Sequence, residues 1–415
     1  MVVRQPKRVL WKPQYTVLTL LWFVYGSFYL NRLNISPVIP LIMRDLNISH
    51  AHMGLITTFF FLAYSITQFP AGYLGYLLGH KRVIAIGAII SAGANLLFGI
   101  GNSLSYLVLC QGLNGLGQGG AWSPSVGIVA NWFSRTERGR VFGIYATCVS
   151  IFTILSYALS SLLGQKFGWR IPFVVPPFII MAVILLFCLI ARETPREQPA
   201  HSTRDLYEGS LFSTRFKEDM KTVLSHKSLW FMGISYSCLM AVRYSIIIWA
   251  PAYLFETFGL NILRAGLLSS TYPAIGLISY PLGGFLCDLI LGGRKKPLIA
   301  VSLLSIFMLA FCLSYVTKLV WAIFLLGCIG FFDQLVTALF FAVEVDLLPK
   351  HLASTGAGFL NTGSAMGSMV AMFLTGLLID VFHSYHIVFI TLSIIALIGG
   401  ISIIKIKESL IEEAF

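Results

Sequence analysis

Long apolar runs separated by short polar segments make up most of this 415-residue chain. Apolar runs of about 18 or more residues with few charges are typical of helices that span a bilayer. We predict twelve such helices, at residues 15–37, 53–76, 82–101, 104–131, 138–164, 171–192, 229–256, 264–290, 297–316, 319–345, 352–380 and 386–405. The pattern therefore predicts an all-α, multi-pass membrane protein.

The positions of the basic residues support this helix count. Of the 29 lysines and arginines, 22 lie at the termini or in loops that follow even-numbered helices, whereas five lie in the other loops. Basic residues favour the cytoplasmic side, so both termini are predicted to be cytoplasmic, in the plasma membrane. The net charge of +12 then follows from topology. We accordingly expect a lipid bilayer around the chain and no nucleic-acid partner.

The composition gives little support to an enzyme. Hydrophobic residues make up 57% of the chain and charged residues 11%, against about 25% charged residues in soluble domains. The seven cysteines show no metal-ligand spacing, and no catalytic triad or carboxylate pair stands out. The glycine-rich run 112–127 has no P-loop lysine and is interpreted as close helix packing. We expect no cofactor, no metal and no catalysis.

The chain contains an internal repeat. The longest polar stretch, 192–228, separates residues 1–191 from residues 229–415, and each part holds six predicted helices. Gly72 and Gly284, each followed by basic residues, are separated by nearly the same distance in sequence as Arg32 and Arg243. Such repeats are typical of transporters with a site between two halves. We predict two pseudo-symmetric six-helix halves joined by a cytoplasmic linker, acting as a monomer.

Two arginines, Arg32 and Arg243, lie inside predicted membrane helices. A charge near the bilayer centre costs about 2.5–3.5 kcal/mol on the insertion scale, so something must hold it. Because a guanidinium is permanently charged and binds phosphate or carboxylate bidentately, we interpret the pair as clamps for a small anionic substrate. In the alternative interpretation, each arginine pairs with an acid and only braces the bundle.

Further polar side chains could complete an anion site. Tyr25 and Tyr29 share a helix face with Arg32, because the three residues follow i, i+4 and i+7 spacing. Tyr244 follows Arg243, while Asn34 and Gln68 are candidates for polar lining. Packing is the alternative role for these residues, since membrane tyrosines often pack or lie at the interface.

Asp333 lies near the middle of predicted helix 319–345. An intramembrane carboxylate is by default a candidate functional residue. It could pair with Arg243 or Arg32 when substrate is absent, carry a coupling proton, or stabilise a cationic part of a substrate. A purely structural salt bridge is the remaining alternative.

The segments around the arginines resemble a known family. The whole chain resembles the major facilitator superfamily in its helix count, central basic loop and glycine-plus-basic repeats. Tyr29-Leu-Asn-Arg32-Leu-Asn34 is similar to helix 1, and the segment from Arg243 to Leu254 to helix 7, of the organophosphate:phosphate antiporters. The segment from Trp132 to Gly139 matches their helix 4–5 loop, which the anion:cation symporters, the next closest family, share.

This resemblance implies a secondary active transporter of a small organic or phosphorylated anion, working by alternating access. Val149 and Gln68 stand where the glycerol-phosphate carriers have a histidine and a lysine, and those carriers have no acid matching Asp333. Exchange of an organophosphate for phosphate is therefore one hypothesis. Symport of an organic carboxylate with a proton or sodium is the alternative, and a membrane sensor that binds without transporting is a third.

Overall fold

The computed structural model describes residues 13–134, 137–194, 221–291, 294–348 and 353–406. Most of the predicted linker 192–228 lies outside these residues. The first part of the chain forms α1 (Pro13–Leu33), η1 (Ser36–Val38), α2 (Ile39–Leu46), α3 (His50–Leu78), α4 (His80–Ile100), α5 (Leu104–Gly119), α6 (Trp122–Trp132), α7 (Arg138–Phe167), η2 (Ile171–Phe173) and α8 (Val175–Ile190).

The later part forms α10 (Lys227–Phe258), α11 (Ile262–Ser269), α12 (Thr271–Leu291), α13 (Lys295–Ser314), α14 (Leu319–Leu347), α15 (Ala353–Phe382) and α16 (Tyr385–Ile404). Within the described residues, eight helical segments are long and apolar enough to cross a membrane: α4, α7, α8 together with η2, α10, α13, α14, α15 and α16. The other four predicted stretches correspond to α1, to α3, to α5 with α6, and to α11 with α12.

The first predicted helix ends earlier than expected and is followed by η1 and α2. The reason is local, because Pro37 and Pro40 have no backbone N–H to continue the helical hydrogen bonds of α1. The helix α2 then ends at Asn47, whose backbone is left-handed, and Ser49 caps the start of α3. The prediction missed this short helix.

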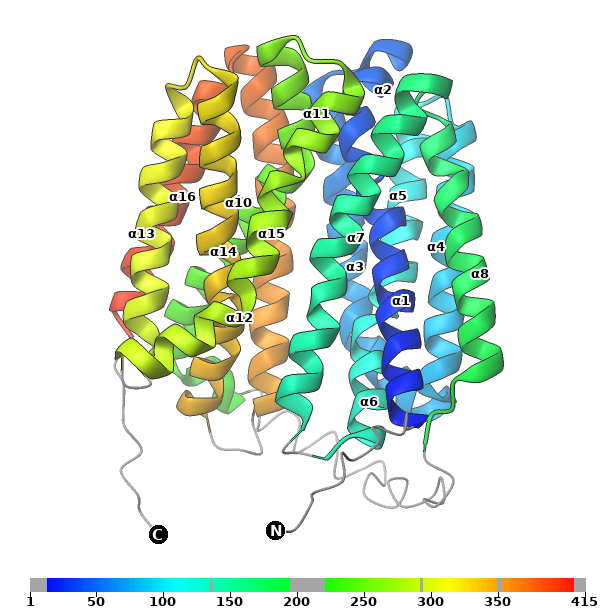
Figure 1. Cartoon of the computed structure of the whole chain (residues 1–415), viewed down its shortest axis with the longest axis vertical. Helices are drawn as coiled ribbons and strands as arrows, with labels where there is room; N and C mark the ends of the chain where they lie inside the picture. Colours follow the sequence, from blue (N-terminus) through cyan, green and yellow to red (C-terminus); the bar gives the residue numbers. More distant parts are fainter. Residues whose placement is uncertain (1–12, 135–136, 195–220, 292–293, 349–352, 407–415) are drawn as a thin grey trace, which may run out of the picture.

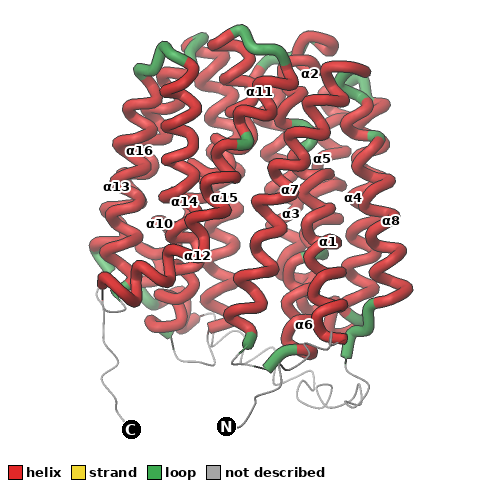
Figure 2. The backbone as a smooth tube through the Cα atoms, in the orientation of Figure 1, coloured by secondary structure: helices red, strands yellow, loops and turns green. Residues whose placement is uncertain are grey.

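The helices form two groups that lie side by side (Figure 1 and Figure 2). The N-terminal group holds α1–α8 and the C-terminal group holds α10–α16. Contacts between the groups run mainly from α3 to α15 and from α7 to α11 and α12. The short helices α2 and α11 lie at one end of the bundle, which we call the α2/α11 end, and α1 begins at the opposite end (Figure 1).

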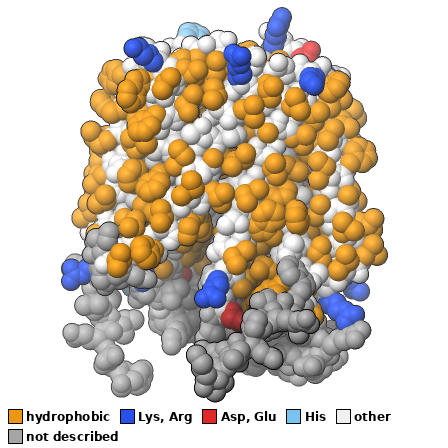
Figure 3. All heavy atoms as spheres, viewed as in Figure 1, with side chains coloured by type: hydrophobic (Ala, Val, Ile, Leu, Met, Phe, Trp, Pro, Cys, Tyr) orange, Lys and Arg blue, Asp and Glu red, His pale blue; other side chains and the backbone are white. Residues whose placement is uncertain are grey.

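Apolar side chains cover the sides of the bundle in a broad belt, and lysines and arginines lie at its two ends (Figure 3). Leu189 and Val320, for example, are 73% and 74% exposed. So large an apolar surface requires a lipid environment. Between helices, the packing depends on small residues, because a side chain at Gly115 of α5 would overlap the Phe60 carbonyl oxygen of α3.

A proline inside α10 leaves one carbonyl without its helical donor. Pro251 has no N–H to offer the carbonyl oxygen of Ile247. That oxygen instead accepts a hydrogen bond from the Tyr157 hydroxyl and lies 2.9 Å from the Ser36 hydroxyl, which is also 2.7 Å from the Ile248 carbonyl oxygen. Two side chains of the N-terminal group thus satisfy a backbone group of the C-terminal group, as a carbonyl buried away from water requires.

Candidate functional site

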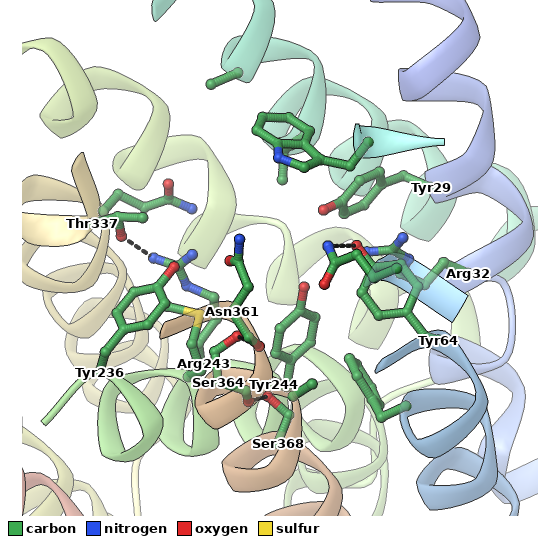
Figure 4. Close-up of a pocket in the computed structure, with 18 of the residues that line it drawn as sticks. Tyr29, Arg32, Tyr64, Tyr236, Arg243, Tyr244, Thr337, Asn361, Ser364 and Ser368 are labelled. Carbon is green, nitrogen blue, oxygen red and sulfur yellow. Dashed lines mark hydrogen bonds between the residues drawn. The ribbon is translucent and has the colours of Figure 1, made fainter. Parts of the chain in front are cut away.

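A cavity lies between the two helix groups, and both arginines line it (Figure 4). Its walls come from α1, α3, α6 and α7 on one side and from α10, α12, α14 and α15 on the other. The lining contains no aspartate, glutamate, lysine or histidine among the described residues. In Figure 4, Arg32 and Arg243 lie on opposite sides, with Tyr244, Asn361 and Ser364 between them.

Arg32 of α1 is buried, at 4% exposure, with no acidic side chain within ion-pair distance in the described structure. Its Nε donates a hydrogen bond of 2.8 Å to Gln118 Oε1. The guanidinium carbon lies 4.5 Å from the ring centre of Tyr29 and 4.8 Å from that of Tyr64, at cation–π distance. One terminal nitrogen, Nη2, has no hydrogen-bond partner. Arg32 is therefore a buried cation with a donor to spare.

Buried amides hold Gln118 behind Arg32. The Gln118 Nε2 donates to Asn114 Oδ1 at 3.0 Å, and Asn114 Nδ2 donates to the Asn31 carbonyl at 3.0 Å. Ser91 joins this network by donating to Asn114 Oδ1 at 2.7 Å. All of these groups are neutral, so the network fixes the orientation of Arg32 without compensating its charge.

Arg243 of α10 has a different partner. Its Nε donates to Asp333 Oδ2 of α14 at 2.7 Å, and the two side chains are 12% and 2% exposed. Arg243 also donates to the Thr337 hydroxyl, while Tyr272 donates to Asp333 Oδ2 at 2.7 Å. Asp333 itself does not line the cavity. The charge of Arg243 is therefore balanced by an acid directly behind it.

The structure brings most of the predicted site residues together. Tyr25, Tyr29, Tyr244 and Gln68 line the cavity together with both arginines. Gln68 donates to the Tyr64 hydroxyl at 3.1 Å. Val149 and Gln68, which replace the histidine and lysine of the glycerol-phosphate carriers, both line the cavity as well.

Asn34 lies elsewhere, which corrects its prediction as a lining residue. It is fully buried, and its Nδ2 donates to Asn95 Oδ1 at 2.8 Å and to the Pro172 carbonyl at 3.0 Å. The helix α1 ends at Leu33, so Asn34 no longer follows the face that carries Arg32. Asn34 joins the end of α1 to α4 and η2 instead.

Several lining residues were not predicted, namely Tyr64, Tyr236, Tyr280, Gln334, Thr337, Asn361, Ser364 and Ser368. The sequence could have indicated the polar lining residues of α15 from their spacing. Asn361, Ser364 and Ser368 follow i, i+3 and i+7 spacing in a glycine-rich helix, which places them on one face. The position of Gln118 behind Arg32 had no such signal.

Comparison with known proteins identifies the family. The model of the Major Facilitator Superfamily matches residues 21–368. The chain belongs to this superfamily. It is similar to a "Probable hexose phosphate transport protein" of Chlamydia trachomatis serovar D, with 29% identity covering 90% of this chain and 87% of that protein. It is also similar to the "Probable galactarate/D-glucarate transporter GudP" of Bacillus subtilis, with 27% identity covering 94% and 93%.

A solved structure gives the same fold. The bacterial homologue of the human lysosomal transporter Spinster, in an inward-facing and unoccupied conformation, aligns with a TM-score of 0.81 at 17% identity, covering 94% of this chain and 96% of that one. The predicted superfamily, its resemblance to the organophosphate:phosphate antiporters and the major facilitator fold are confirmed. The protein is an integral membrane protein of a transporter family whose relatives are named for phosphorylated sugars and organic anions.

Proposed function

We propose that this protein is a secondary active transporter that moves a small organic or phosphorylated anion by alternating access. Residues 1–191 and 229–415 would rock against each other around the cavity, with both termini in the cytoplasm. The substrate would bind near Arg32 and Arg243, with Tyr25, Tyr29, Tyr244 and Gln68 as polar lining. No chemical step is required of the protein.

One observation carries this proposal: the buried guanidinium of Arg32 lines the cavity, its Nη2 has no hydrogen-bond partner, and no acid among the described residues lies within ion-pair distance of it. Leaving such a cation unpaired is costly, so the arrangement favours a ligand that supplies negative charge. Arg243 on the opposite helix group would let one substrate contact both groups.

The test is uptake by the purified protein in liposomes, first with a panel of phosphate esters, carboxylates and sugar acids. Arg32→Ala should lower uptake of the best substrate about 10–150-fold, because a charged hydrogen bond contributes about 1.5–3 kcal/mol. Arg243→Ala should also lower it. Arg44→Ala, which removes an exposed arginine of α2, is the matched control. Near-normal uptake by correctly inserted Arg32→Ala protein would rule out the anion site.

Two coupling mechanisms remain to be distinguished. Symport with a proton would require the substrate to separate Arg243 from Asp333, which would leave Asp333 as a proton acceptor. Symport predicts uptake that a protonophore or removal of sodium lowers, and that Asp333→Asn uncouples. Exchange predicts uptake driven by phosphate inside the liposome and insensitive to a protonophore. Ligand binding without any flux would instead indicate a sensor.

A further inference from the structure

The two arginines at the cavity differ in whether an acidic side chain balances their charge. In the described part of the chain Arg32 has no acidic partner, whereas Arg243 forms an ion pair with Asp333 at 2.7 Å. The remaining described lining residues are neutral. The site with its supporting pair therefore carries a single uncompensated positive charge.

A buried site favours a ligand that brings its net charge to zero, because an unpaired charge away from water costs several kcal/mol. A ligand with one negative charge would neutralise Arg32 and leave the Arg243–Asp333 pair intact. A ligand with two negative charges would leave one unbalanced unless Asp333 were neutralised. Phosphate monoesters carry about 1.5 to 2 negative charges at pH 7.

The rest of the cavity offers neutral hydrogen-bonding groups. Asn361, Ser364 and Ser368 of α15 lie between the arginines (Figure 4). The Ser364 and Ser368 hydroxyls donate to carbonyls of their own helix, at 2.7 Å each, so their oxygens remain available as acceptors. Amides and hydroxyls that face a cavity match the hydroxyl groups of a polar ligand.

We propose that Asp333 sets the valence of the substrate, and that the preferred substrate is a monovalent anion with a hydroxylated body, such as a sugar acid with one carboxylate. The carboxylate binds Arg32, and the hydroxyls bind the polar face of α15. Asp333 acts through Arg243 and does not contact the substrate, so it is a positioning residue for specificity. This inference rests on the proposed transport function.

The test uses two matched ligands, D-gluconate and D-glucarate, which differ only in a second carboxylate at one end of the chain. Binding to the full-length protein in detergent is measured by calorimetry at neutral pH, with glucose 6-phosphate as a second dianion. We expect D-gluconate to bind at least about tenfold more tightly than either dianion. The Asp333→Asn variant should reverse this order, because it releases the charge of Arg243. A neutral replacement of the pair, Arg243→Met with Asp333→Leu, should keep any residual preference for the monoanion.

The outcomes separate the two proposals. Tighter binding of D-glucarate or glucose 6-phosphate to the unmodified protein would overturn the valence inference and leave anion transport standing. Binding of none of the three would overturn the inference of a sugar-acid substrate, and the uptake panel would decide anion transport separately. An Asp333→Asn variant that folds, as judged by size-exclusion chromatography, but keeps the wild-type order would show that Asp333 does not set the valence. If Asp333→Asn fails to fold, the comparison on unmodified protein still decides the valence of the preferred ligand, and the neutral double replacement tests the pair: a variant of that kind that binds D-glucarate more tightly than D-gluconate would overturn the inference.

Discussion

Arg32 and Arg243 have the same side chain but different electrostatic surroundings. The Nε of Arg32 bonds to a neutral amide, Gln118, whereas the Nε of Arg243 bonds to the carboxylate of Asp333. A single substitution beside Arg32 should give it a carboxylate partner like that of Arg243. Gln118→Glu keeps the acceptor and the shape of the side chain but adds a negative charge, so it should abolish anion binding while the protein remains folded.

The matched variant is Gln118→Met, which removes the acceptor without adding charge. Without this acceptor the Arg32 guanidinium loses its fixed orientation, so substrate binding should weaken by about tenfold, or about 1.4 kcal/mol, and not vanish. Calorimetry on both purified variants measures the difference. Equal binding by Gln118→Glu and wild type would mean that the charge of Arg32 does not hold the ligand.

For single residues, the sequence shows which side chains are charged within an apolar run. It does not settle which residue each of these side chains contacts. Arg32, Arg243 and Asp333 stand out because each is a charge within an apolar run. The choice of Asp333 as partner of Arg243, and of Gln118 as partner of Arg32, depends on how α14 and α5 pack against the arginine helices. That packing has no local signal in the chain. Asn34 was misplaced for a different, local reason, since α1 ends at Leu33 ahead of Pro37 and Pro40 whereas the predicted helix continued to residue 37.

Among the elements, α10 shows how a helix break is stabilised from the other helix group. The Ile247 carbonyl oxygen, freed by Pro251, accepts from Ser36 and Tyr157. The double variant Ser36→Ala with Tyr157→Phe should therefore leave a buried acceptor unsatisfied and cost about 1–3 kcal/mol. Thermal unfolding in detergent should show a lower midpoint temperature.

The proline itself provides the control. Adding Pro251→Ala to the double variant supplies a backbone N–H for the Ile247 carbonyl and should recover much of the lost stability. If the triple variant is no more stable than the double variant, the hydroxyls stabilise this region for another reason. The apolar pattern predicts α10, and it places Pro251 inside that helix. It does not predict that two hydroxyls from elsewhere in the chain complete the helix, and it likewise misses the breaks after Gly119 and Ser269.

For the whole molecule, a charged cluster joins the two helix groups at the α2/α11 end. His50 at the start of α3 lies 2.9 Å from Asp380 of α15 through Nδ1 and 3.1 Å from Glu256 of α10 through Nε2. Asp380 also accepts from the backbone N–H of His50 and Ala51, at 3.0 and 2.7 Å. Tyr385 of α16 donates to Glu256 at 2.9 Å. Alternating access would have to break the contacts of His50 and Ala51 with Glu256 and Asp380 whenever this end opens, because within this cluster these are the contacts that join α3 to the C-terminal group.

The protonation of His50 should control that opening. Burial alone would lower the pKa of His50, but the hydrogen bonds and charges of Glu256 and Asp380 outweigh it and raise the pKa above 6.5. When the end opens, His50 leaves both acids and its pKa returns towards the ordinary value. The stabilisation of the closed end is therefore complete below pH 6.5 and is lost as the pH rises through the raised pKa. Higher pH should favour opening.

Distances between spin labels at Arg44 and Lys318, both exposed at this end, would measure the opening in a cysteine-free background. The long-distance population should grow from pH 6 to pH 8.5 in the parent protein. His50→Gln, which cannot titrate, should remove this dependence, whereas His52→Gln should retain it because His52 bonds only to Ser49 in its own helix cap. An unchanged pH response in His50→Gln would mean that another group drives the opening. A pH response of the parent protein does not by itself identify the titrating group. The comparison of His50→Gln with His52→Gln therefore tests the prediction.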